Sequence, residues 1–331
     1  MSYVLGIDLG TSAVKVLLVN RKGQVVKESM KEYQLYQDHP GYSEQNPEDW
    51  YKQTVEAIKE ITNQFEDKDQ IAGISFSGQM HGLVLLDEKN EVLRRAILWN
   101  DTRTTEQCHE IEQTLTREKL LSITKNVALE GFTLPKILWV QQHEPETFKK
   151  AATFLLPKDY VRFRLTGKLN MDYSDAAGTL LLDVAKNEWS AEICHTFNID
   201  KNMCPELVDS HHKVGELLPN VANEIGLNPS TSVFAGGADN ACGAIGSGIL
   251  EDGKTLSSIG TSGVVLSYEK DSDKDFNGKV HYFNHGAENV YYTMGVTLAA
   301  GYSLSWFKNV FASNTEMDDL VKGVSNSSVG A

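Results

Sequence analysis

The stretch GIDLGTSAVK, residues 6–15, carries the strongest fold signal in the chain. An apolar, β-rich run at residues 3–8 leads into Gly10, and a second run rich in β-branched residues covers 13–19. Two such runs around a short glycine-containing turn predict a β-hairpin. The turn between them, Gly10-Thr11-Ser12, offers backbone N–H groups and two hydroxyls, which are donors suited to holding an anion such as phosphate.

Two charged residues flank this turn. Asp8 stands at the end of the first run, where its carboxylate is suited to holding Mg²⁺, and Lys15 adds a nearby positive charge. Taken alone, D-x-G-T-S favours an ordinary hairpin with a polar turn over a phosphate site. The sequence has no G-x-x-x-x-G-K-[ST] and no G-x-G-x-x-G after a strand, which disfavours a Walker-type loop and a dinucleotide-binding fold.

The same pattern recurs near the other end of the chain. GTSAV at 10–14 is echoed by GTSGV at 260–264, and each copy lies between two apolar runs. Five residues of similarity can arise by chance. If the echo is structural, the chain holds two related lobes, each presenting a turn toward a shared cleft, with Gly260-Thr261-Ser262 as the second turn.

The rest of the chain predicts an α/β fold. Asn46 and Pro47 are typical of a helix start, and apolar spacing continues that helix to Ile61. Strands are expected at 71–76, 83–86 and 231–235, with a mostly helical middle at 104–228 and a polar turn at 174–178. Alternating strands and helices indicate this class.

Composition excludes several classes of protein. The 331 residues are 41% hydrophobic and 23% charged, so the chain can form a core and is not disordered. A formal charge of −14 disfavours nucleic-acid and anionic-membrane partners. The uncharged stretch 290–307 is expected to be a buried strand and helix. Without a C-x-x-C pair, the four cysteines are expected to be free thiols, and no signal-peptide pattern appears, which favours the cytoplasm.

Three further segments can carry chemistry. In GGADNACGA at 236–244, Asp239 stands at a strand-to-helix junction, either as a proton acceptor or as a helix cap. In SGQMHG at 77–82, Gln79 and His81 suit sugar hydroxyls, although a loop with a satisfied histidine is an equal alternative. In LWNDTR at 98–103, the aromatic ring suits a sugar face and the charged pair suits hydroxyls, or the pair is a surface ion pair of little consequence; these residues are Trp99, Asp101 and Arg103.

Together these segments resemble the FGGY carbohydrate kinases, and among them the xylulokinases. The resemblance covers essentially the whole chain and rests on GIDLGTSAVK at 6–15, SGQMHG at 77–82, ILWNDTR at 97–103, LPKDYVRFRLTG at 156–167, YSDAAGTLL at 173–181, GGADNACGAIGSG at 236–248 and SSIGTSG at 257–263. It implies a ribonuclease-H-like, actin-like ATPase fold with two lobes around a cleft, the first at 1–245 and the second beginning at 246–331. It also implies transfer of the ATP γ-phosphoryl group to the 5-hydroxyl of D-xylulose.

The resemblance assigns roles to individual residues. Asp239 is the expected general base, and Asp8 supports Mg²⁺ and the phosphates. The sugar pocket is expected to use Met80, His81, Gln79, Trp99, Asp101, Arg103 and Asn240. The ATP phosphates are expected at Gly10, Thr11, Ser12 and Lys15 in the first lobe, and at Gly260, Thr261 and Ser262 in the second.

The family pattern continues beyond this sequence. Members carry an adenosine-binding motif in a longer second lobe, so the second lobe is expected to be incomplete and turnover by this chain is in doubt. Exposed apolar surface on that lobe would favour self-association, for example as a homodimer. The alternatives are an FGGY kinase for gluconate or ribulose, and a sugar-binding fragment without kinase activity.

Overall fold

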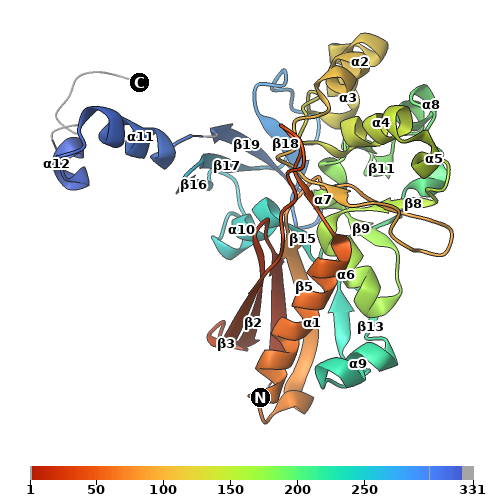
Figure 1. Cartoon of the computed structure of the whole chain (residues 1–331), viewed down its shortest axis with the longest axis vertical. Helices are drawn as coiled ribbons and strands as arrows, with labels where there is room; N and C mark the ends of the chain where they lie inside the picture. The colour runs from red at the N-terminus through yellow and green to blue at the C-terminus, as the bar shows by residue number, and fades with distance from the viewer. Residues whose placement is uncertain (1, 298, 323–331) are drawn as a thin grey trace.

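The computed structural model describes residues 2–297 and 299–322; the tail at 325–331 lies outside these residues. Within the described part, a seven-stranded sheet forms the lower body of the molecule in Figure 1. Its middle strands run parallel, and antiparallel strands extend both edges. The order is β13 (Lys213–Glu216), β14 (Ser232–Phe234), β5 (Ile71–Gly78), β1 (Tyr3–Leu9), β2 (Ala13–Asn20) and β3 (Val25–Glu32), with β15 (Gly237–Ala238) beside β5.

Alternation of side chains builds the core of this sheet. Every second residue of β1 and β2 is buried, at Leu5, Ile7 and Leu9 and at Val14, Val16 and Leu18. This face packs against α1 (Pro47–Asn63), α6 (Pro157–Thr166) and α9 (Pro219–Ile225). The opposite face therefore carries Asp8 and Lys15, which are directly paired across the hairpin.

The predicted start of α1 is confirmed. The Asn46 side chain accepts a hydrogen bond from the Glu48 amide, Pro47 occupies the first turn, and Glu48 and Asp49 complement the positive end of the helix. The buried face of α1 includes Trp50, Ile58 and Ile61. The spacing of apolar residues therefore places this helix on the sheet as expected.

A second, four-stranded sheet lies in the upper left of Figure 1. Its order is β16 (Thr255–Ile259), β17 (Gly263–Glu269), β19 (Tyr291–Thr297) and β18 (His281–Asn284), all antiparallel. The short helix α10 (Asp239–Gly246) lies between the two sheets. One face of the second sheet joins the upper core through Leu266, Phe283 and Tyr292.

Helices with a few short strands between them fill the middle of the chain at 104–228, and further short strands precede it. The helices are α2 (Thr105–Leu115), α3 (Arg117–Thr124), α4 (Thr133–His143), α5 (Pro145–Phe148), α7 (Tyr173–Ala177) and α8 (Ala191–Thr196), with 3₁₀ turns at Lys68–Gln70 and Lys201–Met203. The pairs are β4 (Glu44–Gln45) with β7 (Ala96–Ile97), β6 (Val84–Leu86) with β8 (Thr153–Leu155), β9 (Asn170–Asp172) with β12 (Glu206–Val208), and β10 (Leu182–Asp183) with β11 (Glu188–Trp189). The segment expected to be a turn at 174–178 is mostly helix α7, because the Asp172 side chain caps it.

One expectation about the apolar stretch 290–307 is wrong. The strand β19 buries Tyr291, Tyr292 and Met294, but α11 (Gly301–Phe311) has no buried residue. Figure 1 shows α11 and α12 (Met317–Val321) projecting from the body of the molecule. The side chains of Trp306 and Phe311 are 52% and 66% exposed, so the predicted exposed apolar surface is present.

Two further observations bear on the expectations from composition. Across the described residues, the helices all fall short of the length and hydropathy needed to cross a membrane. The four cysteines are free thiols, as predicted.

Candidate active site

Three parallel strands end side by side and bring the predicted site residues together. Asp8 of β1 and Gly237 of β15 both lie opposite Ser77 of β5, one on each side. The chain then leaves β1 at Gly10, β5 at Gln79 and β15 at Asp239. Crevices at the carboxyl ends of parallel strands are the usual ligand sites of α/β sheets.

The first turn is held from behind by side chains. The Gly10 carbonyl accepts hydrogen bonds from the Tyr33 hydroxyl and from Gln79 Nε2, and the Thr11 carbonyl accepts one from Gln45 Nε2 at 2.7 Å. Within the described residues, the Thr11 and Ser12 amides donate to no protein acceptor. The carbonyls of the turn are thus occupied while two N–H groups remain available for an anion.

Gln79 and Trp99, both expected near the sugar, contact this turn. Gln79 is buried, and its amide group also interacts with Gln45 and the Thr11 hydroxyl. Trp99 is 41% exposed, and its Nε1 donates to Thr11 Oγ1 at 2.9 Å. The polar groups of both side chains therefore orient the turn.

Met80 forms a junction between the two sheets. Its sulfur lies 3.9 Å from Asn240 Nδ2 and 4.0 Å from the Tyr292 hydroxyl. Asn240 belongs to α10 and Tyr292 to β19. Met80 is thus packed beside the residue that follows Asp239.

His81 is held as a neutral ring with a defined tautomer. Its Nδ1 lies 2.6 Å from the Gly178 carbonyl, which can only accept, so the proton is on Nδ1 and Nε2 keeps its lone pair. Burial, together with Lys136, lowers the pKa of His81 to about 3, against a weaker opposing effect of the Gly178 carbonyl. A Cβ at Gly178 would lie 2.8 Å from Nδ1, so this close approach requires glycine.

Asp239 has the electrostatics of a proton acceptor. Its carboxylate stays open to solvent but is surrounded by many protein atoms, and this partial removal from water raises its pKa to about 6. The Asn240 amide, which donates to Oδ1 at 2.7 Å, acts in the opposite direction, and the carboxylate of Asp8 raises the pKa further. The capping alternative is not realised, because Ala238 occupies the N-cap of α10 and Asp239 is its first helical residue.

Asp101 and Arg103 lie one layer behind the site. Arg103 binds Asp101 at 2.7 Å and Glu44 at 2.8 Å, and the Ser43 amide donates to Asp101. The two residues therefore form an ion pair, as the alternative interpretation predicts. The pair is nearly inaccessible to solvent, so it does not lie at the surface. It braces β4, whose Gln45 holds the first turn.

The remaining predicted phosphate contacts lie apart from this cluster. Lys15 Nζ pairs with Glu28 at 3.0 Å, on the neighbouring strand and away from the turn. The second turn joins β16 and β17 as a hairpin, as the echo predicts, and its carbonyls at Gly260 and Thr261 accept from the first residues of α11.

Comparison with protein families decides the assignment. Residues 3–246 match the family model described as "FGGY family of carbohydrate kinases, N-terminal domain". The chain belongs to this FGGY family. The match covers all three strand ends described above.

The names of curated relatives agree with this family assignment. A xylulose kinase of Bacillus subtilis is 62% identical over 333 residues, an alignment that covers all of this chain and 66% of the relative. A xylulose kinase of Staphylococcus xylosus is 48% identical and is covered over 68% of its length. The chain thus spans about two thirds of the length of these relatives.

Solved structures show the same fold. A protein from Brucella ovis described as a xyloylose kinase is 38% identical, with a TM-score of 0.86 over 92% of this chain and 63% of its own. A xylulose kinase from Rhodospirillum rubrum is 26% identical, with a TM-score of 0.91 over 97% of this chain and 65% of its own. The actin-like fold expected for FGGY kinases is therefore present.

The structure adds residues that sequence reasoning missed. Tyr33, Gln45 and Tyr292 each contact a predicted site residue from a distant part of the chain. None of them stands in a segment that the FGGY resemblance singled out. Gly178, whose carbonyl contacts His81, does stand in such a segment, YSDAAGTLL. This glycine is therefore the one feature of the sequence that points to the close approach.

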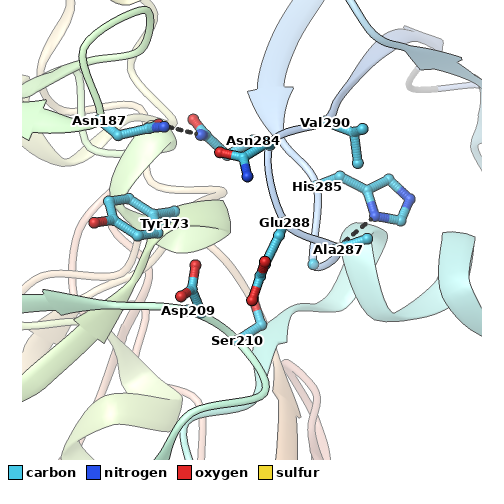
Figure 2. Close-up of a pocket in the computed structure, with 11 residues that line it drawn as sticks. Tyr173, Asn187, Asp209, Ser210, Asn284, His285, Ala287, Glu288 and Val290 are labelled. Carbon is cyan, nitrogen blue, oxygen red and sulfur yellow. Dashed lines mark hydrogen bonds between the residues drawn. The ribbon is translucent and has the colours of Figure 1, made fainter.

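A separate recess opens between α7 and the loop after β12 on one side and the end of β18 on the other. The cavity has a volume of ≈ 270 Å³. Figure 2 shows Tyr173, Asp209 and Ser210 on one side of it, facing Asn284 and Glu288. Neither Asp8 nor Asp239 lines it. The recess is therefore distinct from the strand ends where the predicted site residues gather.

Proposed function

We propose that this chain forms the sugar-binding and proton-accepting part of a kinase that transfers the ATP γ-phosphoryl group to D-xylulose. The observation that carries the proposal is the position of Asp239 at a strand end beside Asp8, with Met80, Asn240 and the first turn around it. The similarity to proteins named xylulose kinase supports the choice of sugar.

Residues of this chain accept the proton and hold both substrates in the proposed reaction. The sugar 5-oxygen forms a bond to the γ-phosphorus while the bond to the ADP oxygen breaks, and the Asp239 carboxylate takes the hydroxyl proton. With a pKa of about 6, this carboxylate is ionised at neutral pH and ready to accept. His81 Nε2 accepts from another sugar hydroxyl, and the free amides of Thr11 and Ser12 hold phosphate oxygen.

Asp8 is the residue that fits Mg²⁺. Its carboxylate is exposed and close enough to Asp239 to raise the pKa of that group, and Mg²⁺ prefers such oxygen donors. When bound, Mg²⁺ would neutralise charge on the phosphates.

The proposed partners are thus a sugar and ATP. The net charge of −14 argues against nucleic acid, and a cytoplasmic location fits a kinase that consumes ATP. The exposed apolar face of α11 supports self-association.

The test compares Asp239→Asn with the unaltered chain. Asp200→Asn is a matched control, because Asp200 also accepts a nearby backbone N–H, that of Asn202. ADP release is measured with D-xylulose, D-ribulose and D-gluconate, and sugar binding by calorimetry. We expect a preference for D-xylulose, and a loss of about 10²–10⁴ in turnover for Asp239→Asn with sugar binding kept.

Other outcomes would change the proposal. Full turnover in Asp239→Asn would remove the general-base role, and preference for another sugar would change the substrate. Selective D-xylulose binding without ADP release would identify a sugar-binding unit without kinase activity.

A further inference from the structure

Five charged side chains are completely buried beneath the site. We call them the buried charge cluster: Lys158, Asp159, Arg162, Asp172 and Asp175. Lys158 Nζ lies 2.6 Å from Asp172, 2.7 Å from Asp159 and 2.8 Å from Asp175. Arg162 completes the cluster with a 2.8 Å contact to Asp159. Charges this deep are stable only when they are paired and hydrogen-bonded.

The cluster contains one more carboxyl group than cations. Burying a net charge is unfavourable, so one carboxyl should hold a proton. Asp175 is that group: burial raises its pKa well above the usual range, the charge of Lys158 opposes this, and Asp172 and Asp159 reinforce it. With Asp175 neutral, two cations face two carboxylates, and Asp172 stays ionised as a strong hydrogen-bond acceptor.

Arg162 of the cluster, and Ser174, which is bound to Asp172 of the cluster, hold the segment that leads into Asp239. Arg162 donates to the Ala235 carbonyl at 2.7 Å. Ser174 Oγ accepts the Ala238 N–H at 2.9 Å and donates its own proton to Asp172 Oδ2. Ser174 therefore connects an ionised, immobile carboxylate to the residue immediately before Asp239.

The start of this segment, at Gly236, packs closely against β5. Gly236 has φ +74°, and a Cβ there would collide with the Phe76 carbonyl oxygen. The Gly236 amide donates to the Ser210 carbonyl, and Ser210 Oγ donates to Asp172 Oδ2 at 2.7 Å. The same carboxylate thus anchors both sides of the segment 236–238.

We propose that Ser174 is a positioning residue for Asp239, fixed in place by Asp172 and Lys158. The catalytic part of this inference rests on the function proposed above, whereas the structural part does not. Ser174 touches neither substrate nor reacting atoms; it acts through the Ala238 amide. Misplacement of a catalytic group by about 1 Å can cost on the order of 10²-fold in rate.

The test is Ser174→Ala in the full chain, with Ser190→Ala as the matched control. Ser190 is also a buried serine whose Oγ accepts a backbone N–H, that of Ile193, at the start of α8. The first readout is the pKa of Asp239 from the carboxyl ¹³C shift in aspartate-labelled protein, assigned with Asp239→Asn. The second is kcat and KM for D-xylulose phosphorylation.

For Ser174→Ala we expect the pKa of Asp239 to fall from about 6 toward the ordinary value of about 4, because a released base becomes better hydrated. We expect kcat to fall by about 10- to 100-fold, with a change in KM below about threefold. Ser190→Ala should change neither. If Ser174→Ala does not fold, Ser174→Cys replaces it, since a thiol accepts only weakly and should shift the pKa in the same direction.

An unchanged pKa of Asp239 in the folded variant, or an equal shift in Ser190→Ala, would overturn the positioning role. If the unaltered chain phosphorylates no sugar, the proposed function fails. The pKa of Asp239 still tests the positioning of the carboxyl group by Ser174 in that case, so the two failures are distinguishable.

Discussion

At the scale of single residues, the environment of Asp239 sets its chemistry. Removal from water and the nearby Asp8 carboxylate raise the pKa to about 6, while the Asn240 amide limits the increase. A base must be ionised in the free enzyme, so kcat/KM for D-xylulose should fall about tenfold per pH unit below pH 6 and level off above it. A pH–rate profile from pH 5 to 8 measures this. A profile that is flat down to pH 5 would contradict the assignment of Asp239 as the base.

The same pKa shift affects stability. The folded-state pKa of Asp239 lies above the unfolded value of about 4, so the folded state binds the proton more tightly and loses stability as pH rises from about 4 through 6. Asp239→Asn removes this ionisation. We expect the variant to be more stable by about 1 kcal/mol at pH 7.5, less than full linkage gives because the carboxylate is open to solvent. At pH 4 the difference should nearly vanish.

Urea unfolding of both proteins at the two pH values measures this difference. Asp200→Asn is the control for loss of a carboxylate that accepts a backbone N–H. A variant that is less stable at pH 7.5 would show that the hydrogen bond from the Asn240 amide to the Asp239 carboxylate outweighs the cost of removing that carboxylate from water.

At the scale of elements, α6 supplies the cation that holds α7 and β9 together. Burial acts to lower the pKa of Lys158, but its three carboxyl partners outweigh burial and raise it. Lys158→Met should destabilise the protein by about 3–5 kcal/mol, because it leaves carboxylates buried without their partner. The loss should grow from pH 5 to pH 8, since the carboxyl groups, with pKa values raised by loss of the cation, ionise over that range.

Equilibrium unfolding at both pH values checks this prediction. Lys149→Met is a suitable comparison, because Lys149 pairs with Glu146 at the surface and should contribute less than about 1 kcal/mol. Equal losses in the two variants would mean that the buried charge cluster does not stabilise the fold.

The elements around the site differ in how far sequence predicts them. The hairpin at 6–15 and the start of α1 follow from local patterns, because alternation and capping act between neighbouring residues. The contacts of Gln45, Tyr33 and Tyr292 join residues 23 to 212 positions apart, and no local pattern encodes them. Lys158 and Asp175 carry no local sign of burial either, since charged residues are expected at the surface.

At the scale of the whole molecule, the two sheets differ in how well they are covered. Hydrophobic cores cover one face of the first sheet and one face of the second. The helix α11 instead projects from the molecule with its apolar residues exposed. An open face of this kind promotes association. We expect the chain to associate with rising concentration, and Trp306→Arg with Phe311→Glu to reduce this. Sedimentation velocity measures it, and association that the two substitutions leave unchanged would place the contact elsewhere.

The account as a whole depends on one claim: the ends of β1, β5 and β15 form a pocket for D-xylulose. Calorimetric titration of this chain with D-xylulose, with D-gluconate as the control sugar, tests it most directly. The account predicts selective D-xylulose binding that His81→Ala weakens by at least about tenfold, through loss of a hydrogen bond, and that Ser190→Ala leaves unchanged. Equal binding of both sugars, or D-xylulose binding that His81→Ala does not alter, would contradict it.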